Sequence, residues 1–543
     1  MQKPDWLKAA TVYSLDFRSF YDGNDDGLGD IAGLISKFDY LVELGVNCIW
    51  LAPFYCSPRH DDGYDVVDYF RIDPQIGTMD DFRALVATAK AHDIRILLDL
   101  VVNHTSIDHP WFKKALEDPT SAYYEYYIWK KQKPEDDKDD LMFEGVEESN
   151  WDYEPSVSAY FYHTFYKHQP DLNVANPQVQ NEILRILDFW MSTGIDGFRI
   201  DAVPHILRNK GDCHFKGDPY QLLEVWRSAV LKHNEHAVLI GEADVEPEEY
   251  RDFLNRGQLT GLFNFYINNY TFLALATEKG TPLVNAIRRL PLADGRRYLN
   301  FIRNHDELDL GRLTEEERHQ VFERFAPEPS MIVYNRGIRR RLASMVHHNN
   351  RQMELTLSLL FSLPGIPVLR YGEEIGMGDD LNLPERKSVR TAMQWSDQRN
   401  GGFSEMPPQA LKYPLIQEGP ASYKRINVAS QQADPTSLLQ VTKKLIRLHE
   451  GNGHFFFDGS FELLDTNHSA ILAFSYQIGS ERLVTVHNFS RQGISAIIML
   501  PHQTGARISV LVNSHQVTSS DGRLSLQLPG YGYSWFIVHD TIA

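Results

Sequence analysis

The sequence contains few cysteines and no long apolar run. Its 543 residues include only Cys48, Cys56 and Cys213, too few for the disulfide framework of a small secreted domain. No stretch of about 18 apolar residues occurs, which argues against a transmembrane helix. Residues 1–10 lack the apolar core of a signal peptide. These absences predict a protein of a reducing compartment, the cytoplasm, with no membrane partner.

Positive charge is also scarce. The chain carries 54 lysine and arginine residues against 73 aspartate and glutamate residues, a formal net charge of −19. A surface of this sign repels phosphate backbones, so nucleic acid is not an expected partner. Aromatic residues make up 12% of the chain. Their flat rings suit either sugar binding or a large core, and composition alone does not separate the two.

Short apolar runs alternate with helical patterns over most of the chain. The runs are apolar on both faces, as parallel strands covered by helices should be. Eight such alternations predict a (β/α)8 TIM barrel, an α/β fold. The strands are expected at residues 11–17, 48–54, 94–102, 197–203, 237–243, 262–267, 298–305 and 366–371, the sixth with the weakest pattern.

Two segments depart from this alternation. Residues 105–170, after the third strand, are rich in Trp, Tyr and charge and are interpreted as an inserted subdomain. After about residue 451 the pattern changes to short strands without helices, which predicts a C-terminal antiparallel β-sandwich. The expected domains are therefore a barrel at 1–104 and 171–450, the insertion at 105–170 and the sandwich at 451–543.

Charged residues stand at the ends of four predicted strands, at Asp99, Asp201, Glu242 and Asp306. The carboxyl ends of barrel strands meet at one mouth, where active sites lie. A buried carboxylate is costly unless it is paired or used, so packing alone does not account for this set. Glycoside cleavage with retention needs one carboxylate to attack the anomeric carbon and one carboxylic acid, about 5–5.5 Å away, to protonate the leaving oxygen.

Four strand-end segments, at 99–104, 197–201, 240–243 and 303–306, resemble the signature regions of the α-amylase superfamily in the family's order. The resemblance covers nearly the whole chain. It implies that Asp201 is the nucleophile, Glu242 the general acid/base and Asp306 the transition-state stabiliser. Supporting residues implied are Arg199, which keeps Asp201 ionised; His104 and His305, which bind the sugar; and Asp99, which supports the site from the side.

Two further segments resemble those with which α-glucosidase-like members hold a terminal glucose. In 63–65, Tyr64 is implied to stack on the glucose and Asp65 to accept from a hydroxyl at its far end. In 389–395, Arg390 is implied to pair with Asp65 and the sugar, the alternative being a surface ion pair. Gln169 opens a short motif, 169–173, found in the insertion of members that act on small α-glucosides.

The segment 22–30 places oxygen ligands at alternate positions with glycines between them, as a short calcium-binding loop does. It resembles the Ca²⁺ loop of α-glucosidase-like members, and the alternative is a solvated acidic turn. The implied ligands are Asp22, Asn24, Asp26, the Leu28 carbonyl and Asp30.

Some relatives hold a second calcium ion with residues that match Asn103 and Asp171 and with a carboxylate after the fourth strand. Here the stretch after that strand, residues 205–208, contains no carboxylate. The sequence therefore argues against a second calcium site without excluding it.

Within the superfamily, the chain is most similar to the trehalose synthases, which isomerise maltose. The similarity lies in residues 301–309, in a basic loop containing 315–318 and 337–342, and in 362–379; departures at 383–388 and at Ala392 flank Arg390. It implies isomerisation of maltose to trehalose through a β-glucosyl-enzyme, with some hydrolysis. An α-glucosidase or transglucosylase acting on maltose, sucrose or isomaltose is the open alternative, and a non-catalytic amylase-like binding protein a remote one. A homodimer or homotetramer is left open.

Overall fold

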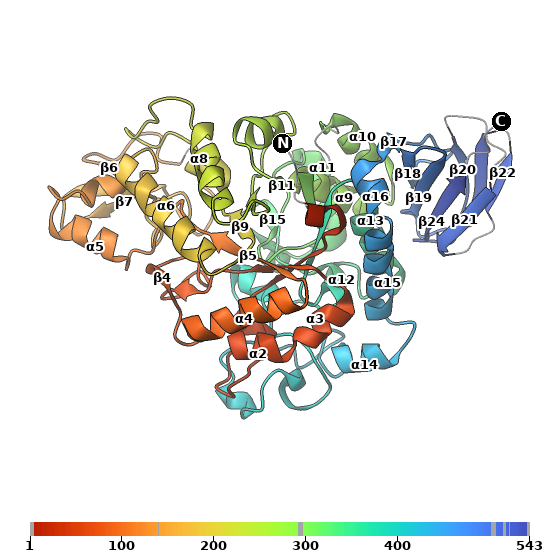
Figure 1. Cartoon of the computed structure of the whole chain (residues 1–543), viewed down its shortest axis with the longest axis horizontal. Coiled ribbons are helices and arrows are strands. Elements are labelled where there is room, and N and C mark those ends of the chain that lie inside the picture. Colours follow the sequence, from red (N-terminus) through yellow and green to blue (C-terminus); the bar gives the residue numbers. More distant parts are fainter. Residues whose placement is uncertain are drawn as a thin grey trace.

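Eight parallel strands close into a barrel at the centre of the molecule (Figure 1). The structure is a computed structural model that describes residues 5–138, 141–291, 297–500, 507–513, 517–520 and 522–539. Residues 1–4, part of the segment predicted to lack the apolar core of a signal peptide, lie outside the described residues. The predicted fold class is confirmed. The barrel strands are β1 (Val12–Leu15), β2 (Cys48–Leu51), β5 (Arg95–Leu100), β9 (Gly197–Ile200), β10 (Val238–Gly241), β11 (Gly261–Phe263), β12 (Tyr298–Phe301) and β16 (Ile366–Arg370).

The helices around the barrel follow their local sequence signals. Helix α3 (Phe38–Leu44) ends at Gly45, whose φ of 92° is a left-handed conformation that glycine adopts without strain. Helix α6 (Pro177–Met191) begins after Asn176, which caps it by accepting from the Gln178 amide. Both termini lie where the sequence pattern changes.

The sixth strand is shorter than predicted. Strand β11 stops at Phe263 because the Asn264 side chain accepts from the Ile267 amide and caps α9 (Phe265–Thr277). Nearly every residue of the first two turns of α9 is buried. A helix that is apolar all round shows no amphipathic period, so the sequence pattern could not separate its start from a buried strand.

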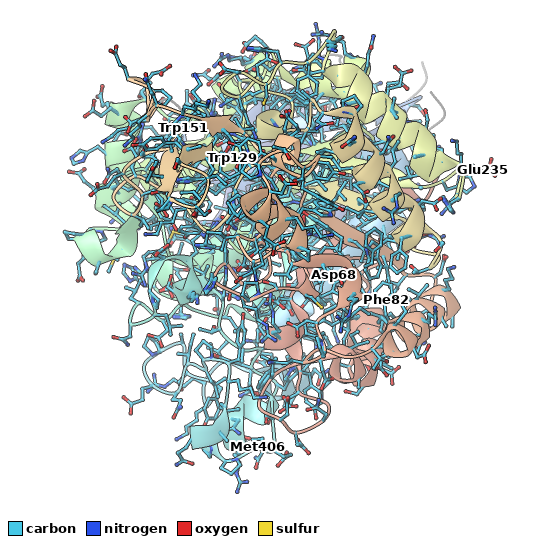
Figure 2. All side chains as sticks on the ribbon, turned by 90° about the vertical axis from the view of Figure 1, so that its left-hand side faces the viewer. Asp68, Phe82, Trp129, Trp151, Glu235 and Met406 are labelled. Atoms are coloured by element: carbon cyan, nitrogen blue, oxygen red, sulfur yellow. The ribbon has the colours of Figure 1, made fainter. Side chains whose placement is uncertain are left out.

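The segment between β5 and β9 forms a lobe on one side of the barrel. It contains α5 (Pro110–Glu117) and a three-stranded antiparallel sheet of β6 (Trp129–Lys130), β8 (Ala159–Tyr162) and β7 (Trp151–Glu154). Figure 2 shows Trp129 and Trp151 on this lobe, far from Met406 at the lower end of the molecule. The Trp129 ring stacks on Tyr124 and Phe112, with centroids 4.7 and 5.6 Å away. These stacks join the lobe to the main hydrophobic core, whereas Ile128, Trp151 and Tyr162 form a small separate cluster.

The C-terminal part follows α15 (Leu438–Gly451) and α16 (Gly453–Asp458) and consists of antiparallel sheets at the opposite end of the molecule from the lobe (Figure 1). Trp535 Nε1 donates to Ser358 Oγ at 2.9 Å and Tyr476 Oη to the Ser362 carbonyl at 2.8 Å, which fixes the sheets to α13 (Asn350–Ser362). The sequence pattern indicated no strand at β22 (Val517–Ser520) or at β23 (Arg523–Leu528). The strands are β17 (Ser460–Leu463), β18 (Ile471–Ile478), β19 (Glu481–Asn488), β20 (Ile494–Met499), β21 (Arg507–Val512), β22 (Val517–Ser520), β23 (Arg523–Leu528) and β24 (Tyr533–His539).

A long connection joins β12 to β16 and contributes to the mouth of the barrel. It holds a small sheet of β13 (Leu308–Asp309), β15 (Gly337–Ile338) and β14 (Ile332–Val333), with α11 (Glu315–Phe325) between β13 and β14. None of the helices in the described part of the chain combines the length and apolar character needed to cross a bilayer.

Candidate active site

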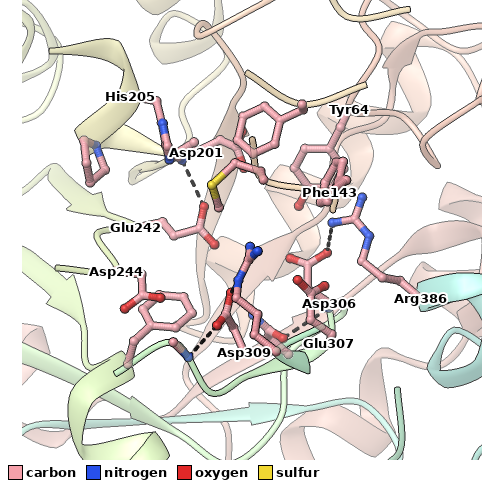
Figure 3. Close-up of a pocket in the computed structure, with 18 of the residues that line it drawn as sticks. Tyr64, Phe143, Asp201, His205, Glu242, Asp244, Asp306, Glu307, Asp309 and Arg386 are labelled. Atoms are coloured by element: carbon pink, nitrogen blue, oxygen red, sulfur yellow. Dashed lines mark hydrogen bonds and ion pairs between the residues drawn. The ribbon is translucent and has the colours of Figure 1, made fainter. Parts of the chain in front are cut away.

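A cavity of about 450 Å³ opens at the carboxyl ends of the barrel strands (Figure 3). This size lies within the usual range for small-molecule sites. Asp201, Glu242 and Asp306 all line it, as do Tyr64 and His305. The structure therefore brings the three predicted catalytic carboxylates into one pocket, although they lie more than 100 residues apart from first to last.

Arg199 holds the predicted nucleophile and the predicted acid together. Its Nη1 lies 2.7 Å from Asp201 Oδ1 and 2.6 Å from Asp99 Oδ1, and its Nη2 lies 2.7 Å from Glu242 Oε2. Side chains two residues apart on a strand point to the same face. Arg199 in β9 and Asp201 directly after it therefore both face the mouth. The Ala202 amide donates to Glu242 Oε2 at 2.9 Å. Because one guanidinium contacts both carboxylates, they are close enough to act on the same glycosidic bond.

The surroundings raise the pKa of Glu242 and of Asp201 and lower that of Asp306. Burial raises the pKa of Glu242 to about 7, Arg199 opposes the rise, and the charges of Asp201 and Asp306 add to it. A carboxyl with such a pKa can donate a proton near neutral pH. Burial also raises the pKa of Asp201 to about 7, with Arg199 opposing the rise and Asp99 and Asp306 adding to it; the guanidinium 2.7 Å away favours its anion. For Asp306, burial is outweighed by His305 and Arg386, and its pKa lies well below the ordinary value.

Asp306 is fixed by two arginines at one carboxylate oxygen and by an imidazole at the other. Arg386 Nη1 lies 2.6 Å and Arg390 Nη2 2.9 Å from its Oδ1, and His305 Nε2 lies 3.1 Å from its Oδ2. Burial lowers the pKa of His305 to about 4. A charge-fixed carboxylate suits the stabilisation of positive charge at the anomeric carbon.

Aromatic and imidazole rings form the end of the pocket where the terminal glucose is expected. Tyr64 stacks on His305 with centroids 5.1 Å apart and donates to Asp99 Oδ2 at 2.9 Å. His104 lies 3.1 Å from the Tyr64 carbonyl. Tyr64, His104 and His305 all line the pocket, so their assigned contacts with a sugar are sterically open.

The predicted pairing of Asp65 with Arg390 is wrong. Asp65 is fully buried below the pocket, where it accepts from Ser57 Oγ at 2.8 Å and the His60 amide at 2.8 Å. These hydrogen bonds fix the conformation of the loop that contains Asp65. Asp65 does not line the pocket. Arg390 Nη1 instead lies 2.6 Å from Asp62 Oδ2. The prediction identified the loop but misplaced the acidic residue within it by three positions.

Asp61 and Arg386 were missed by the sequence interpretation, although both line the pocket. Arg386 Nη2 lies 2.7 Å from Asp61 Oδ1, while its Nη1 contacts Asp306. Gln169 donates to Asp61 Oδ2 at 3.1 Å, so Gln169 orients this carboxylate and does not itself line the cavity. The available signal was the Asp61-Asp62 pair directly before Gly63-Tyr64.

Three separate segments meet beside the pocket. Tyr166 from the inserted segment and Tyr334 from the β12–β16 connection both donate to Glu385 Oε2, at 2.5 and 2.7 Å. Phe143 packs against both tyrosine rings, with centroids 4.3 and 4.5 Å away, and lies over the Arg386 guanidinium. Of these rings Phe143 lines the cavity, so the cluster borders one side of the pocket.

The predicted calcium loop offers oxygen donors of the kind that Ca²⁺ requires. Asp22 and Asp30 are buried, and their carboxylates accept from the backbone amides of the loop, for example Gly27 to Asp22 at 2.7 Å. Lys412 Nζ lies 2.8 Å from Asp26 Oδ2. In the described residues, the set of three metal-ligand side chains with atoms within 4.8 Å of one another is Glu147, Asp152 and His163, not the carboxylates of this loop. The donor chemistry fits calcium; bound calcium would have to draw the carboxylates closer together.

A lysine occupies the place considered for a second calcium ion. Lys210 Nζ donates to Asn103 Oδ1 and to Asp171 Oδ2, both at 2.6 Å. Lys210 is 6% exposed and Asp171 is fully buried. The ammonium group supplies positive charge to these two oxygens from within the chain, so these residues do not fit a calcium ion.

Comparison with known proteins agrees with the geometry. Residues 15–458 match the model of the α-amylase catalytic domain. The chain is 38% identical over 545 residues to "Trehalose synthase/amylase TreS" of Mycobacterium tuberculosis, covering 98% of this chain and 90% of that protein. It is 38% identical to a trehalose synthase of Thermus thermophilus (98% and 55% covered) and 30% identical to an oligo-1,6-glucosidase of Parageobacillus thermoglucosidasius (96% and 97%).

Solved structures show the same fold. The trehalulose synthase MutB of Pseudomonas mesoacidophila superposes with a TM-score of 0.78 at 24% identity, covering 98% of this chain and 99% of that one. The α-amylase catalytic domain matches most of the chain and the strand-end carboxylates lie in one pocket, so the chain belongs to the α-amylase family.

Proposed function

We propose that this protein is a retaining α-glucosyl-transferring enzyme that isomerises maltose to trehalose, with some hydrolysis. The observation that carries the proposal is the pocket in which Arg199 joins Asp201 to Glu242. The similarity to trehalose synthases over almost the whole chain supports it. The expected substrates are small neutral α-glucosides: maltose, trehalose and sucrose.

In the first step, the Asp201 carboxylate attacks C1 of the non-reducing glucose. The C1–O bond of maltose breaks, and Glu242 transfers its proton to the departing O4 of the second glucose. The products are a β-glucosyl ester on Asp201 and a free glucose molecule. Asp306, held anionic by Arg386 and Arg390, lies where positive charge develops on the ring.

In the second step, the retained glucose turns and presents its anomeric hydroxyl to C1. The Glu242 carboxylate takes the hydroxyl proton, the new C1–O bond forms, and the ester to Asp201 breaks, which releases trehalose. Water in place of glucose gives hydrolysis. Closure of the pocket by the neighbouring cluster of Phe143, Tyr166 and Tyr334 would favour the retained sugar over water.

Incubation with maltose and analysis of products over time tests the proposal. We expect trehalose to accumulate, with glucose as a minor product, and the reverse reaction from trehalose to reach the same ratio. Glucose without trehalose at any time would instead establish an α-glucosidase. That second candidate is favoured by the similarity to an oligo-1,6-glucosidase, so isomaltose and sucrose belong in the same assay.

We further propose that the loop of residues 22–30 binds one structural Ca²⁺ through Asp22, Asn24, Asp26, the Leu28 carbonyl and Asp30. The ion would fix the loop beside α2 (Ile31–Ser36), which Asp30 caps, and would take no part in the chemistry. Elemental analysis of the purified protein should find one calcium per chain and none in the Asp22→Asn variant. A calcium-free wild-type protein whose melting temperature does not respond to added Ca²⁺ would refute it.

Free cysteine thiols are typical of proteins in a reducing compartment. Cys48 is buried, and none of the three cysteines forms a disulfide. We propose the cytoplasm as that compartment.

A further inference from the structure

The basic loop that resembles trehalose synthases contributes charged side chains to the pocket. Arg318 of α11 and Arg336 before β15 line the cavity, together with Glu307 and Asp309 from the start of the same connection. In Figure 3, Asp309 lies below Glu242, whereas Tyr64 lies above it. The connection therefore forms a wall beyond the catalytic carboxylates, away from the expected glucose end.

The charges on this wall are incompletely paired. Arg336 Nε lies 2.8 Å from Asp309 Oδ2, but its buried Nη2 has no hydrogen-bond partner among the described residues. Arg318 donates to the Leu313 carbonyl at 3.5 Å, and no described carboxylate lies within ion-pair distance of it. Its Nε is also buried without a partner. Both guanidinium groups thus retain donors that the protein does not satisfy.

Glu307 is the acidic counterpart on this wall. It is 8% exposed, it forms no ion pair with a described residue, and its buried Oε2 has no hydrogen-bond partner. Burial, opposed by Arg386, raises the pKa of Glu307 to about 7. Unsatisfied buried polar groups are rare in folded proteins and call for a partner. A sugar hydroxyl both donates and accepts, so a sugar ring satisfies free guanidinium donors and a free carboxyl at once.

We propose that Arg318 and Arg336, with Glu307, form the subsite that holds the second sugar of the reaction, an uncharged hexose with free hydroxyls. This sugar is the leaving group of the first step and the acceptor of the second. The inference rests on the proposed function for the identity of that sugar. An uncharged ligand follows from the wall itself, because its unpaired groups include both a cation and a carboxyl.

The test uses α-D-glucosyl fluoride as donor, because fluoride leaves without occupying a sugar subsite. Fluoride release reports formation of the glucosyl-enzyme, and ¹³C-labelled glucose reports transfer to an acceptor. In Arg318→Gln and Arg336→Gln, transfer to glucose should fall about tenfold or more beyond any loss of fluoride release, as expected for removal of a charged hydrogen bond. Arg318→Lys should recover part of the transfer.

Arg324→Gln is the matched control, since Arg324 lies on the same helix but does not line the pocket. It should behave as wild type in both assays. The inference is overturned if both pocket variants transfer to glucose as well as wild type, or lose fluoride release and transfer equally, which a merely structural role would produce. It is also overturned if glucose 6-phosphate is a better acceptor than glucose.

Failure of the proposed isomerisation is distinguishable from failure of this subsite. A wild-type enzyme that makes no trehalose still releases glucose from maltose through the same leaving-group position. In that case the two pocket variants should raise KM for maltose about tenfold relative to KM for α-D-glucosyl fluoride. Equal changes in KM for maltose and in KM for α-D-glucosyl fluoride would contradict the proposed subsite, whichever product the enzyme forms.

Discussion

The two ends of the pocket differ in how completely their polar groups are paired within the protein. At the glucose end, Asp61, Arg386 and Arg390 form a continuous chain of ion pairs with Asp306. At the other end, Arg318 and Glu307 have no ionic partner among the described residues. A pre-paired end is rigid and suits one ring that stays in place during both steps. An end with unsatisfied groups suits a ring that must be released, turned and bound again.

Replacement of Asp201 by Asn should have the largest effect. Both steps of the proposed reaction, at the glucose end and at the second-sugar end, pass through the glucosyl ester on Asp201. Loss of the nucleophile prevents formation of the glucosyl ester, and turnover of maltose and of α-D-glucosyl fluoride should both fall by about 10⁴-fold or more. Steady-state rates with the two donors measure this. Mass spectrometry of wild type treated with 5-fluoro-α-D-glucosyl fluoride should locate the label on the peptide containing Asp201. A label on another carboxylate would contradict the assignment.

Asp61→Asn tests the paired end. The substitution removes one of the two carboxylates that hold Arg386, which contacts Asp306 at 2.6 Å. Breaking a buried charged pair costs several kcal/mol, so kcat/KM should fall by about 100-fold. Because the terminal glucose is common to all substrates, maltose and α-D-glucosyl fluoride should be affected by the same factor. A loss confined to maltose would place Asp61 at the end that holds the second sugar. It would contradict the assignment of the ion-paired groups to the glucose end.

The pH dependence of kcat/KM distinguishes a donor whose leaving group occupies the second-sugar end from one whose leaving group does not. Glu242, whose pKa is about 7, is the proposed acid that protonates the departing second sugar. The acid form is present below that pKa and is lost as pH rises through it. On maltose, kcat/KM should therefore fall about tenfold per pH unit above pH 7. Fluoride departs without protonation, so α-D-glucosyl fluoride should show no such basic limb. The same limb on both donors would assign it to another group.

The sequence allowed prediction of those parts of this site that the fold itself determines. Asp201, Glu242 and Asp306 were predictable because the carboxyl ends of parallel barrel strands must meet at one mouth. The pairing of Arg390 with Asp62 in place of Asp65 was not, because it depends on the conformation of an irregular loop. Lys210 was not predicted for the same reason: it lies after residues 205–208, and only the folded chain brings its ammonium group to Asp171.

The smallest effect is expected at Arg312, which lines the same wall as Arg318 and Arg336. Its guanidinium lies 2.8 Å from Asp244 and 3.1 Å from Glu246, so two carboxylates already balance its charge. In Arg312→Gln, transfer to ¹³C-glucose should fall only two- to threefold, by roughly 0.5 kcal/mol, against about tenfold in Arg318→Gln. Burial raises the pKa of Asp244 to about 7, and loss of the opposing arginine should favour its neutral form, which limits the cost to folding. Transfer losses as large as those of Arg318→Gln would show that pairing within the protein does not decide which wall residues bind the sugar.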